Sequence, residues 1–220
     1  MAKRNYVEEI LQKKSRNHKN GSRNDIFLRR VHPLVEGFRQ IRALDKSIKW
    51  REEWLKYGAI GYVACVEGYI RLLIADVINQ GQPYLDRVSN FKEIKFNAEI
   101  VVALQKKEIT LGDYISHLLP INNLSDINSH LTILLDTDYI KFYKQQSLSD
   151  SDNRLIGEVF GKDLGQLEKL FKLRHMHAHE LATREKFPVG EIEEYIGSAA
   201  VFVTFTEEIF ERILSNSPSE

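Results

Sequence analysis

The segment from Ser47 to about Gln80 carries the strongest helical signal in the chain. Its apolar residues recur at intervals of three and four, which is the period of one broad helix face. Three glycines within it lower the helix propensity, but they would let a second helix approach closely. The tripeptide Gly81-Gln82-Pro83 is expected to end the helix. Few prolines and glycines elsewhere also argue against a many-stranded sheet, so the sequence predicts an all-α fold.

The same spacing marks further helices on both sides of this segment. Asp25 is expected to cap a helix to about Leu44, which Pro33 either kinks or starts afresh. The β-branched run at 200–206 could form a strand, but its spacing and flanking glutamates favour helix. The remaining expected elements are helices at 110–119 capped by Thr110, at 125–135 capped by Ser125, at 138–145, from the cap Asp163 into Arg174, and from Val189 to about Leu214, with loops at 147–153 and 183–190.

Length and composition are those of one helical domain. The 220 residues, 43% of them hydrophobic and 28% charged, suffice for a full-sized core. Residues 1–24 are expected to form a basic, flexible arm, because seven basic residues outnumber three acidic ones up to Asp25. Residues 25–214 are expected to form the domain, including an insert at 91–153 that could serve as a lid, a specificity element or a partner surface. Residues 215–220 are expected to be a disordered tail.

The charge balance limits the kinds of partner. With 31 basic and 31 acidic residues the net charge is zero, which argues against wrapping a nucleic acid by bulk electrostatics but allows a local positive pocket. Cys65 is the single cysteine, so no intrachain disulfide can form and a reducing compartment is expected. No signal peptide and no uncharged membrane-length stretch is evident, so we expect a cytoplasmic protein without a membrane partner.

Three histidines follow one arginine near the C-terminus, at Arg174, His175, His177 and His179. On a helix His175 and His179 share a face, and Arg174 and His177 lie together on the adjoining face. Arginine matches phosphate oxygens with its planar fork, and histidine moves protons near neutral pH. In RNA the attacking group is the neighbouring 2′-hydroxyl, so this set could cut a phosphodiester without a metal, a cofactor or a covalent enzyme intermediate.

The arrangement Arg-polar-x-x-x-His at the end of the penultimate helix, before a loop and a long last helix, resembles the HEPN superfamily, in particular its RiboL-PSP-HEPN-like and toxin or phage-defence branches. Arg174 matches the arginine, His175 the polar position and His179 the final histidine. Upstream, the run Val66-Glu67-Gly68-Tyr69-Ile70-Arg71 resembles the long family helix with its inward-facing glutamate. The resemblance implies an up-and-down helical bundle, here with a helical insertion between the long second helix and the motif helix.

For function, the resemblance implies a metal-independent endoribonuclease that leaves a 2′,3′-cyclic phosphate and a 5′-hydroxyl. It implies a homodimer with a composite cleft, an RNA substrate, and a role as a toxin or phage-defence effector, with an antitoxin as a further partner. Arg174 would bind phosphate, His179 would act as general acid or base, and His175 would be a supporting contact. Glu67 would orient Arg174, and His177 would be a bystander or a substrate contact. The alternative within the family is an inactive scaffold that binds a nucleotide or a partner protein.

Other interpretations of the cluster stay open. It could be a solvated helix end, where basic residues favour the helix dipole. It could bind zinc through His175 and His179 with His177, Glu180 or His117 as a further ligand, although Arg174 would repel a cation. A third class of function is a structural adaptor whose basic arm binds nucleic acid.

Several single residues have simpler interpretations. Glu67 and Arg71, one helical turn apart, could form an ion pair with each other. Trp50 and Trp54 are expected to pack in the core or in a dimer seam rather than to stack on RNA bases. The scattered histidines are expected to be surface or structural residues; they are His18, His32, His117 and His130.

Overall fold

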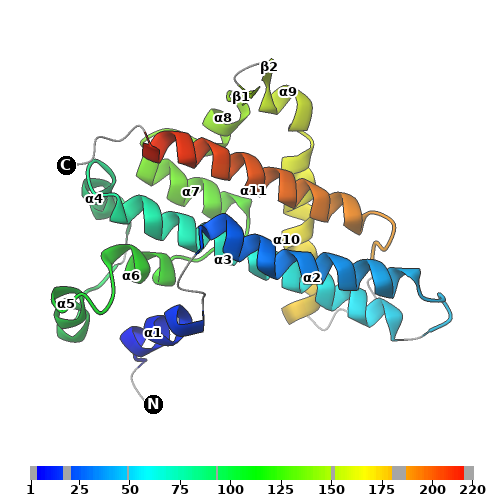
Figure 1. Ribbon diagram of the computed structural model, residues 1–220, viewed down its shortest axis with the longest axis horizontal. Coiled ribbons are helices and arrows are strands. Elements are labelled where there is room, and N and C mark those ends of the chain that lie inside the picture. Colours follow the sequence, from blue (N-terminus) through cyan, green and yellow to red (C-terminus); the bar gives the residue numbers. More distant parts are fainter. Residues whose placement is uncertain are drawn as a thin grey trace.

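Four long helices form the frame of the molecule (Figure 1). The computed structural model describes residues 4–16, 21–48, 50–92, 94–149, 152–179 and 187–215, without the side chains of residues 152 and 179. The long helices are α2 (Arg23–Ala43), α3 (Arg51–Asn79), α10 (Asp163–His179) and α11 (Ile192–Ser215). Helix α3 runs through the middle, α2 lies along it, and α10 crosses it and packs on both α3 and α11. The predicted all-α bundle is confirmed.

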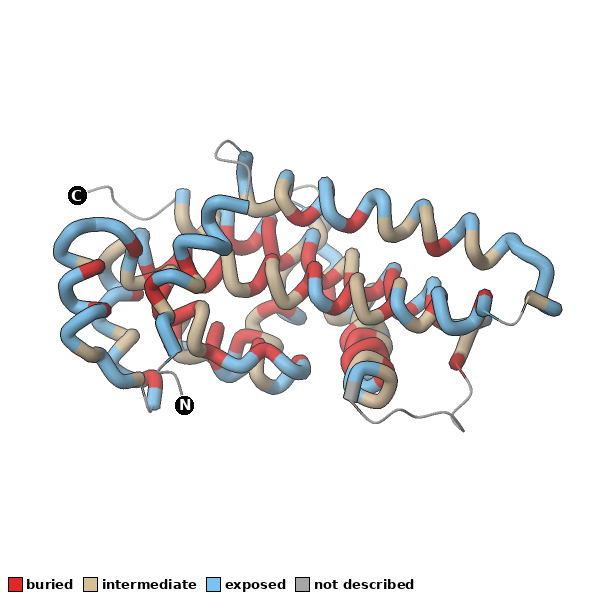
Figure 2. Tube along the Cα trace, turned by 90° about the horizontal axis from the view of Figure 1, so that it is seen from below, coloured by how far each residue is buried: buried red, intermediate tan, exposed pale blue. Residues whose placement is uncertain are grey.

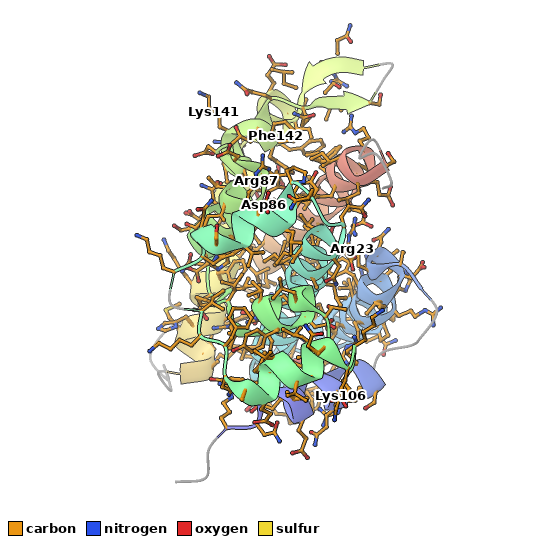
Figure 3. The ribbon with its side chains drawn as sticks, turned by 90° about the vertical axis from the view of Figure 1, so that its left-hand side faces the viewer. Arg23, Asp86, Arg87, Lys106, Lys141 and Phe142 are labelled. Atoms are coloured by element: carbon orange, nitrogen blue, oxygen red, sulfur yellow. The ribbon has the colours of Figure 1, made fainter. Side chains whose placement is uncertain are left out.

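Shorter elements surround one end of this frame. Their bounds are α1 (Tyr6–Arg16), α4 (Tyr84–Arg87), the 3₁₀ turn η1 (Val88–Asn90), α5 (Ala98–Gln105), α6 (Leu111–Leu118), α7 (Leu124–Leu135), α8 (Tyr139–Lys144), β1 (Ser147–Ser149), β2 (Asp152–Leu155) and α9 (Ile156–Phe160). Helices α6 and α7 pack on α3, and α7 also touches α10. Arg87, labelled in Figure 3, closes the C-terminal end of α7 by donating from Nη1 to the carbonyl of Leu134 at 2.6 Å. The expected insert therefore packs against both helices of the candidate site.

The core is centred on α3, which buries fourteen of its residues. Figure 2 shows buried positions concentrated along the middle of the molecule and exposed ones on the outer helix faces. By length and composition alone α3 could cross a membrane, but 56% of its most apolar 18-residue window is buried inside this fold. A core helix meets the same criterion, because it needs an apolar surface on every side that another helix covers.

Glycines allow two helices to lie close to α3. The sequence predicted this for Gly58 and Gly61, whereas Gly68, the third glycine of the helix, has nothing within 4 Å of its Cβ position. A Cβ atom at Gly58 would come within 2.9 Å of Phe38 on α2, and one at Gly61 within 3.3 Å of Leu34. On the other side a Cβ at Gly112 of α6 would lie 2.3 Å from the carbonyl oxygen of Ala75. Larger residues at these positions would push α2 or α6 away from the core.

A buried ion pair joins α2, α3 and α11. Arg23 donates from Nε to Glu207 at 2.6 Å and from Nη1 to Asp76 at 2.9 Å. Glu207 also accepts a hydrogen bond from the Tyr69 hydroxyl at 2.6 Å. Burial and the neighbouring Glu207 raise the pKa of Tyr69 far above its ordinary value, so the hydroxyl stays a donor. Every charge in this cluster has a partner, as buried charges require.

The N-terminal segment differs from the expected flexible arm. Residues 6–16 form helix α1, which buries Val7 and Ile10 and packs on α5 and α6. The ring of Tyr6 meets that of Tyr114 edge to face, with centroids 6.3 Å apart. Lys14 forms an ion pair with Asp113 of α6 at 2.7 Å. Two buried apolar side chains and this pair hold a segment whose composition alone indicated a solvated arm.

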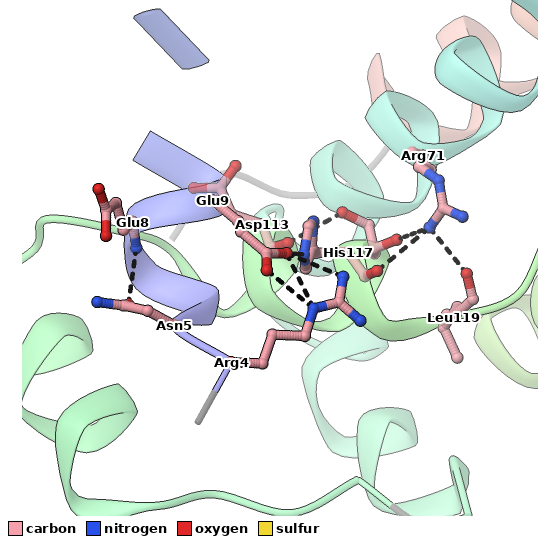
Figure 4. A network of polar contacts seen from close by, with 9 residues as sticks. Arg4, Asn5, Glu8, Glu9, Arg71, Asp113, His117 and Leu119 are labelled. Atoms are coloured by element: carbon pink, nitrogen blue, oxygen red, sulfur yellow. Dashed lines mark hydrogen bonds and ion pairs between the residues drawn. The ribbon is translucent and has the colours of Figure 1, made fainter. Parts of the chain in front are cut away.

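A second polar link between α1 and α6 is shown in Figure 4. Glu9 accepts from Nε of Arg4 at 2.8 Å and lies 2.9 Å from Nε2 of His117. These two contacts lower the pKa of Glu9 to about 2. Burial lowers the pKa of His117, and Glu9 opposes that shift without cancelling it. The folded state therefore favours ionised Glu9 and neutral His117.

Several predicted helix boundaries differ by a few residues. Helix α2 is capped by Ser22, and Asp25 completes the capping box as its third residue. Pro33 lies inside this single helix, whose buried residues Phe27, Val31 and Phe38 hold it on α3. Helix α7 is capped by Asn123 instead of Ser125, while Thr110 caps α6 as predicted. At the starts of α2 and α7, two neighbouring side chains could each accept the hydrogen bond of the helix cap, so the sequence alone does not show which one does.

One predicted loop, the bounds of the last helix and the packing of two tryptophans also need correction. The expected loop at 147–153 contains an antiparallel hairpin, and Leu148 anchors it against the core. The last helix begins at Ile192 instead of Val189 and ends at Ser215, the first residue of the predicted tail. Residues 183–186 of the predicted loop and 216–220 of the tail lie outside the described residues. Trp50 and Trp54 are 51% and 56% exposed, so they are not core residues. Their expected place in a dimer seam stays a prediction.

Candidate functional site

The candidate site lies on the last two turns of α10. Leucines and one phenylalanine hold the earlier part of this helix in the core; they are Leu164, Leu167, Leu170, Phe171 and Leu173. From Arg174 onward the described side chains are half-buried or exposed. The apolar stripe thus fixes the helix in the core, and its final turns carry the arginine and the histidines.

Arg174 is held by an acidic residue of the central helix. Its Nη2 donates a hydrogen bond to Oε1 of Glu67, and the two side chains are only 15% and 18% exposed. Burial raises the pKa of Glu67, and the positive charges of Arg174 and Arg71 oppose this shift. The pair fixes a guanidinium in position while it remains partly open to solvent.

Arg71 does not form the ion pair with Glu67 that the spacing allowed. Its Nη1 instead donates to the carbonyls of Ser116 at 2.5 Å and Leu119 at 2.8 Å, at the C-terminal end of α6 (Figure 4). Unsatisfied carbonyls at a helix end carry partial negative charge and attract a cation. Among the described residues, the ion-pair partner of Glu67 is therefore Arg174.

A pocket of about 730 Å³ opens beside Arg174. One wall is α10 and the other is the segment that starts α7. Its lining residues are Asn122, Asn123, Leu124, Ser125, Glu168, Phe171, Lys172, Arg174 and His175. The volume falls within the range of about 300–1,000 Å³ that is common for small-molecule sites. The pocket combines two permanent cations with an imidazole, which suits a phosphate-bearing ligand.

The remaining histidines of the cluster are placed differently. His175 is exposed and lines the same pocket as Arg174. His177 packs its ring against Phe187, with centroids 5.7 Å apart, and is not part of the pocket lining. His179 is the last residue of α10, and its side chain lies outside the described part of the chain. Arg174, Glu67 and His175 are thus brought together, whereas the role of His179 stays a prediction.

The described residues do not supply a set of ligands for the zinc site that the sequence allowed. Within that part of the chain, no group of three His, Cys, Asp or Glu side chains is arranged to hold a metal ion. The side chain of His179 and the whole of Glu180 lie outside the described part of the chain. His117, named as a further ligand, contacts Glu9 of α1 instead. His130 is structural, with Nε2 2.7 Å from the carbonyl of Pro120.

Sequence reasoning missed five polar residues of the pocket. Glu168 and Lys172 lie seven and three residues before His175, which places all three on one helix face. That spacing could have identified both of them. Asn122, Asn123 and Ser125 come from a segment about fifty residues upstream, and no local pattern links them to α10. Only the packing of α7 on α10 brings them to the site.

The chain matches one family of known proteins. A family model described as RiboL-PSP-HEPN matches residues 34–212, which is more than three quarters of the chain. The matched range includes Glu67 on α3 and the whole of α10. No curated protein and no solved structure gives a significant match.

Proposed function

The chain belongs to the RiboL-PSP-HEPN family, and on this premise we propose that it is a metal-independent endoribonuclease. A HEPN domain is consistent with an RNA-cutting or a nucleotide-binding role. The observation that favours cutting is the position of Arg174, which Glu67 holds at the edge of a pocket large enough for a nucleotide. A fixed guanidinium can bind the scissile phosphate and stabilise the charge that develops on it.

The proposed reaction is an internal transfer of the phosphoryl group. The 2′-oxygen attacks the adjacent phosphorus and loses its proton, and the bond from phosphorus to the 5′-oxygen breaks. The leaving 5′-oxygen takes up a proton, and no water is consumed. His179 supplies or accepts one of these protons, while His175 makes a supporting contact in the pocket. The products are a 2′,3′-cyclic phosphate and a 5′-hydroxyl.

The complete site is proposed to need two copies of the chain. The net charge of zero supplies no general attraction for RNA, so cations must be concentrated locally. Two copies of α10 facing each other across a two-fold axis would double the arginine and histidine content of one cleft. In this proposal the protein acts in the cytoplasm as a toxin or phage-defence effector, and an antitoxin protein would hold it in check.

The test is RNA cleavage by the purified protein in the presence of EDTA. Wild type is expected to cut, and His179→Ala to cut at least about 100-fold more slowly, because general acid–base catalysis contributes that much. His32→Ala, which removes an exposed histidine on α2, is the matched control and should retain full activity. Loss of wild-type cleavage on chelation, or full activity in His179→Ala, would contradict the proposal. A stable protein that binds nucleotides without cutting any RNA would favour the inactive scaffold.

A further inference from the structure

The pocket beside Arg174 has a second wall that the proposed chemistry does not use. Residues 122–125 at the start of α7 line it opposite α10, and they belong to the segment that the sequence predicted to be an insert. Transfer of a phosphoryl group requires only the α10 side with Glu67. The opposite wall can therefore serve to recognise the part of the ligand that does not react.

The polar side chains on this wall differ in whether they already form hydrogen bonds within the protein. Asn123 is committed as the helix cap, since its Oδ1 accepts from the backbone amide of Asp126 at 2.8 Å. The exposed side chains of Asn122 and Ser125 form no hydrogen bond with any residue that the structure describes. Each carries both a donor and an acceptor, as the edges of nucleobases do.

Within the same pocket, the basic and acidic side chains of α10 lie at opposite ends. Lys172, Arg174 and His175 form one end of the α10 wall, and Glu168 lies about 10 Å from His175 along the helix axis. Neither Glu168 nor Lys172 has an ion-pair partner among the described residues. A phosphate favours the cationic end, and a carboxylate at the other end accepts hydrogen bonds from N–H groups and repels a second phosphate.

We propose that this pocket seats the nucleotide adjoining the scissile phosphate, with its phosphate at Arg174 and Lys172 and its base between Glu168 and Asn122. This inference rests on the proposed ribonuclease function and adds a base preference to it. An ionised carboxylate only accepts hydrogen bonds, so Glu168 favours the exocyclic amino groups of adenine, cytosine and guanine. Uracil has no amino group, and the N3–H donor on its pairing edge lies between two carbonyl oxygens that repel a carboxylate, so uracil is discriminated against.

The test maps cleavage positions on RNA of randomised sequence. Wild type is expected to cut next to uracil less often than next to the other bases at one adjoining position. Glu168→Gln should reduce this discrimination by about threefold to tenfold, which is the worth of one hydrogen bond, because the amide also donates. Asn122→Ala should change the preference among bases by a similar factor. Glu211→Gln and Asn90→Ala, both exposed and outside the pocket lining, are the matched controls.

A second measurement separates this inference from the ribonuclease proposal. Binding of the four nucleoside 3′-monophosphates is followed by calorimetry, which needs no cleavage. The uridine nucleotide should bind most weakly, and Glu168→Gln should bring its affinity closer to the others. RNA cleavage with the same base preference in wild type, Glu168→Gln and Asn122→Ala overturns the subsite and leaves the nuclease proposal standing. Nucleotide binding that responds to Glu168→Gln without any RNA cleavage supports the subsite and overturns the nuclease proposal.

Discussion

Two clusters of arginine and carboxylate side chains join other helices to α3, and they differ in how many hydrogen bonds the arginine forms within the protein. Arg23 of α2 bonds two carboxylates, and its partner Glu207 also accepts from Tyr69. Arg174 of α10 bonds one carboxylate, that of Glu67, and its guanidinium borders an open pocket. Within the described part of the chain, Glu67 is the one residue that forms a side-chain hydrogen bond with Arg174.

The difference separates a structural pair from a functional one. A guanidinium has five N–H donors, so an arginine with several internal partners has few left for a ligand. The Arg23 cluster has two carboxylates around one guanidinium and holds α2, α3 and α11 together. Arg174 has one carboxylate partner among the described residues and borders the pocket, which positions the guanidinium and keeps donors for an anion. Changes to the Arg23 cluster should affect stability, and changes to the Arg174 pair should affect activity beyond any effect on stability.

The largest effect is expected from Glu207→Ala. Arg23 would lose its closest carboxylate while its side chain stays only 10% exposed, leaving a buried charge without its main partner. We expect the free energy of unfolding to fall by about 3–5 kcal/mol, measured by urea denaturation. Glu211→Ala, an exposed residue on the same helix, serves as control and should change it little. A Glu207→Ala protein as stable as wild type would show that the Arg23–Glu207 pair is not structural.

Arg174→Ala should have the next largest effect, on catalysis. Loss of a group that stabilises the transition-state charge should slow RNA cleavage by about 100- to 1,000-fold. We expect the melting temperature to fall as well, because Glu67 is only 18% exposed and loses its ion-pair partner, so cleavage is measured at a temperature where the variant is folded. Arg29→Ala, an exposed arginine on α2, should cut like wild type. Equal losses of activity in both variants would mean that Arg174 contributes only general charge.

Glu67→Gln should have a smaller effect, because the amide preserves shape and one acceptor. Without the charge, Arg174 is positioned less firmly, and a charge-assisted hydrogen bond is worth about 1.5–3 kcal/mol. We expect kcat to fall about tenfold to 100-fold with little change in KM and in melting temperature. Steady-state kinetics on a short RNA separates the two parameters. A change confined to KM or to stability would contradict a positioning role.

The smallest effect is expected at the partly buried link between α1 and α6. The pKa of Glu9 is lowered to about 2, so its contribution is complete above its ordinary value near 4.5 and is lost as the pH falls toward 2. The pKa of His117 is also lowered, so its protonation below about 6.5 favours release of α1. The protection factors of the α1 amides, which are exchange rates corrected for the intrinsic effect of pH, should therefore fall on acidification before those of α3. His117→Asn should remove the part of this change that begins below about pH 6.5.

The sequence predicted the features that depend on local spacing. The long helix α3, the motif helix α10 and the positions of Arg174, His175 and Glu67 follow from periodicity and from a six-residue motif. Boundaries were less accurate where two capping residues stand close together, as Ser22 and Asp25 do at the start of α2. The contact of Glu67 with Arg174 could be proposed only because the resemblance suggested it.

What the sequence could not show depends on contacts between distant segments. Whether α1 docks is decided by Val7 and Ile10 meeting α5 and α6, which charge composition does not reveal. The wall formed by Asn122 and Ser125 exists because α7 packs on α10, and no spacing relates these segments. Trp50 and Trp54 show the opposite problem, since large aromatic side chains predicted burial and the fold leaves them half exposed.

The most direct test of the central claim is the mass of the first cleavage products. A short RNA is incubated with the protein in EDTA, and the fragments are weighed by mass spectrometry at early times. If the 2′-hydroxyl attacks at the Arg174 pocket, the two fragments have together the mass of the intact RNA, and one ends in a 2′,3′-cyclic phosphate. Fragments that together carry one added water from the outset, or that form only when a divalent metal is present, would contradict the account.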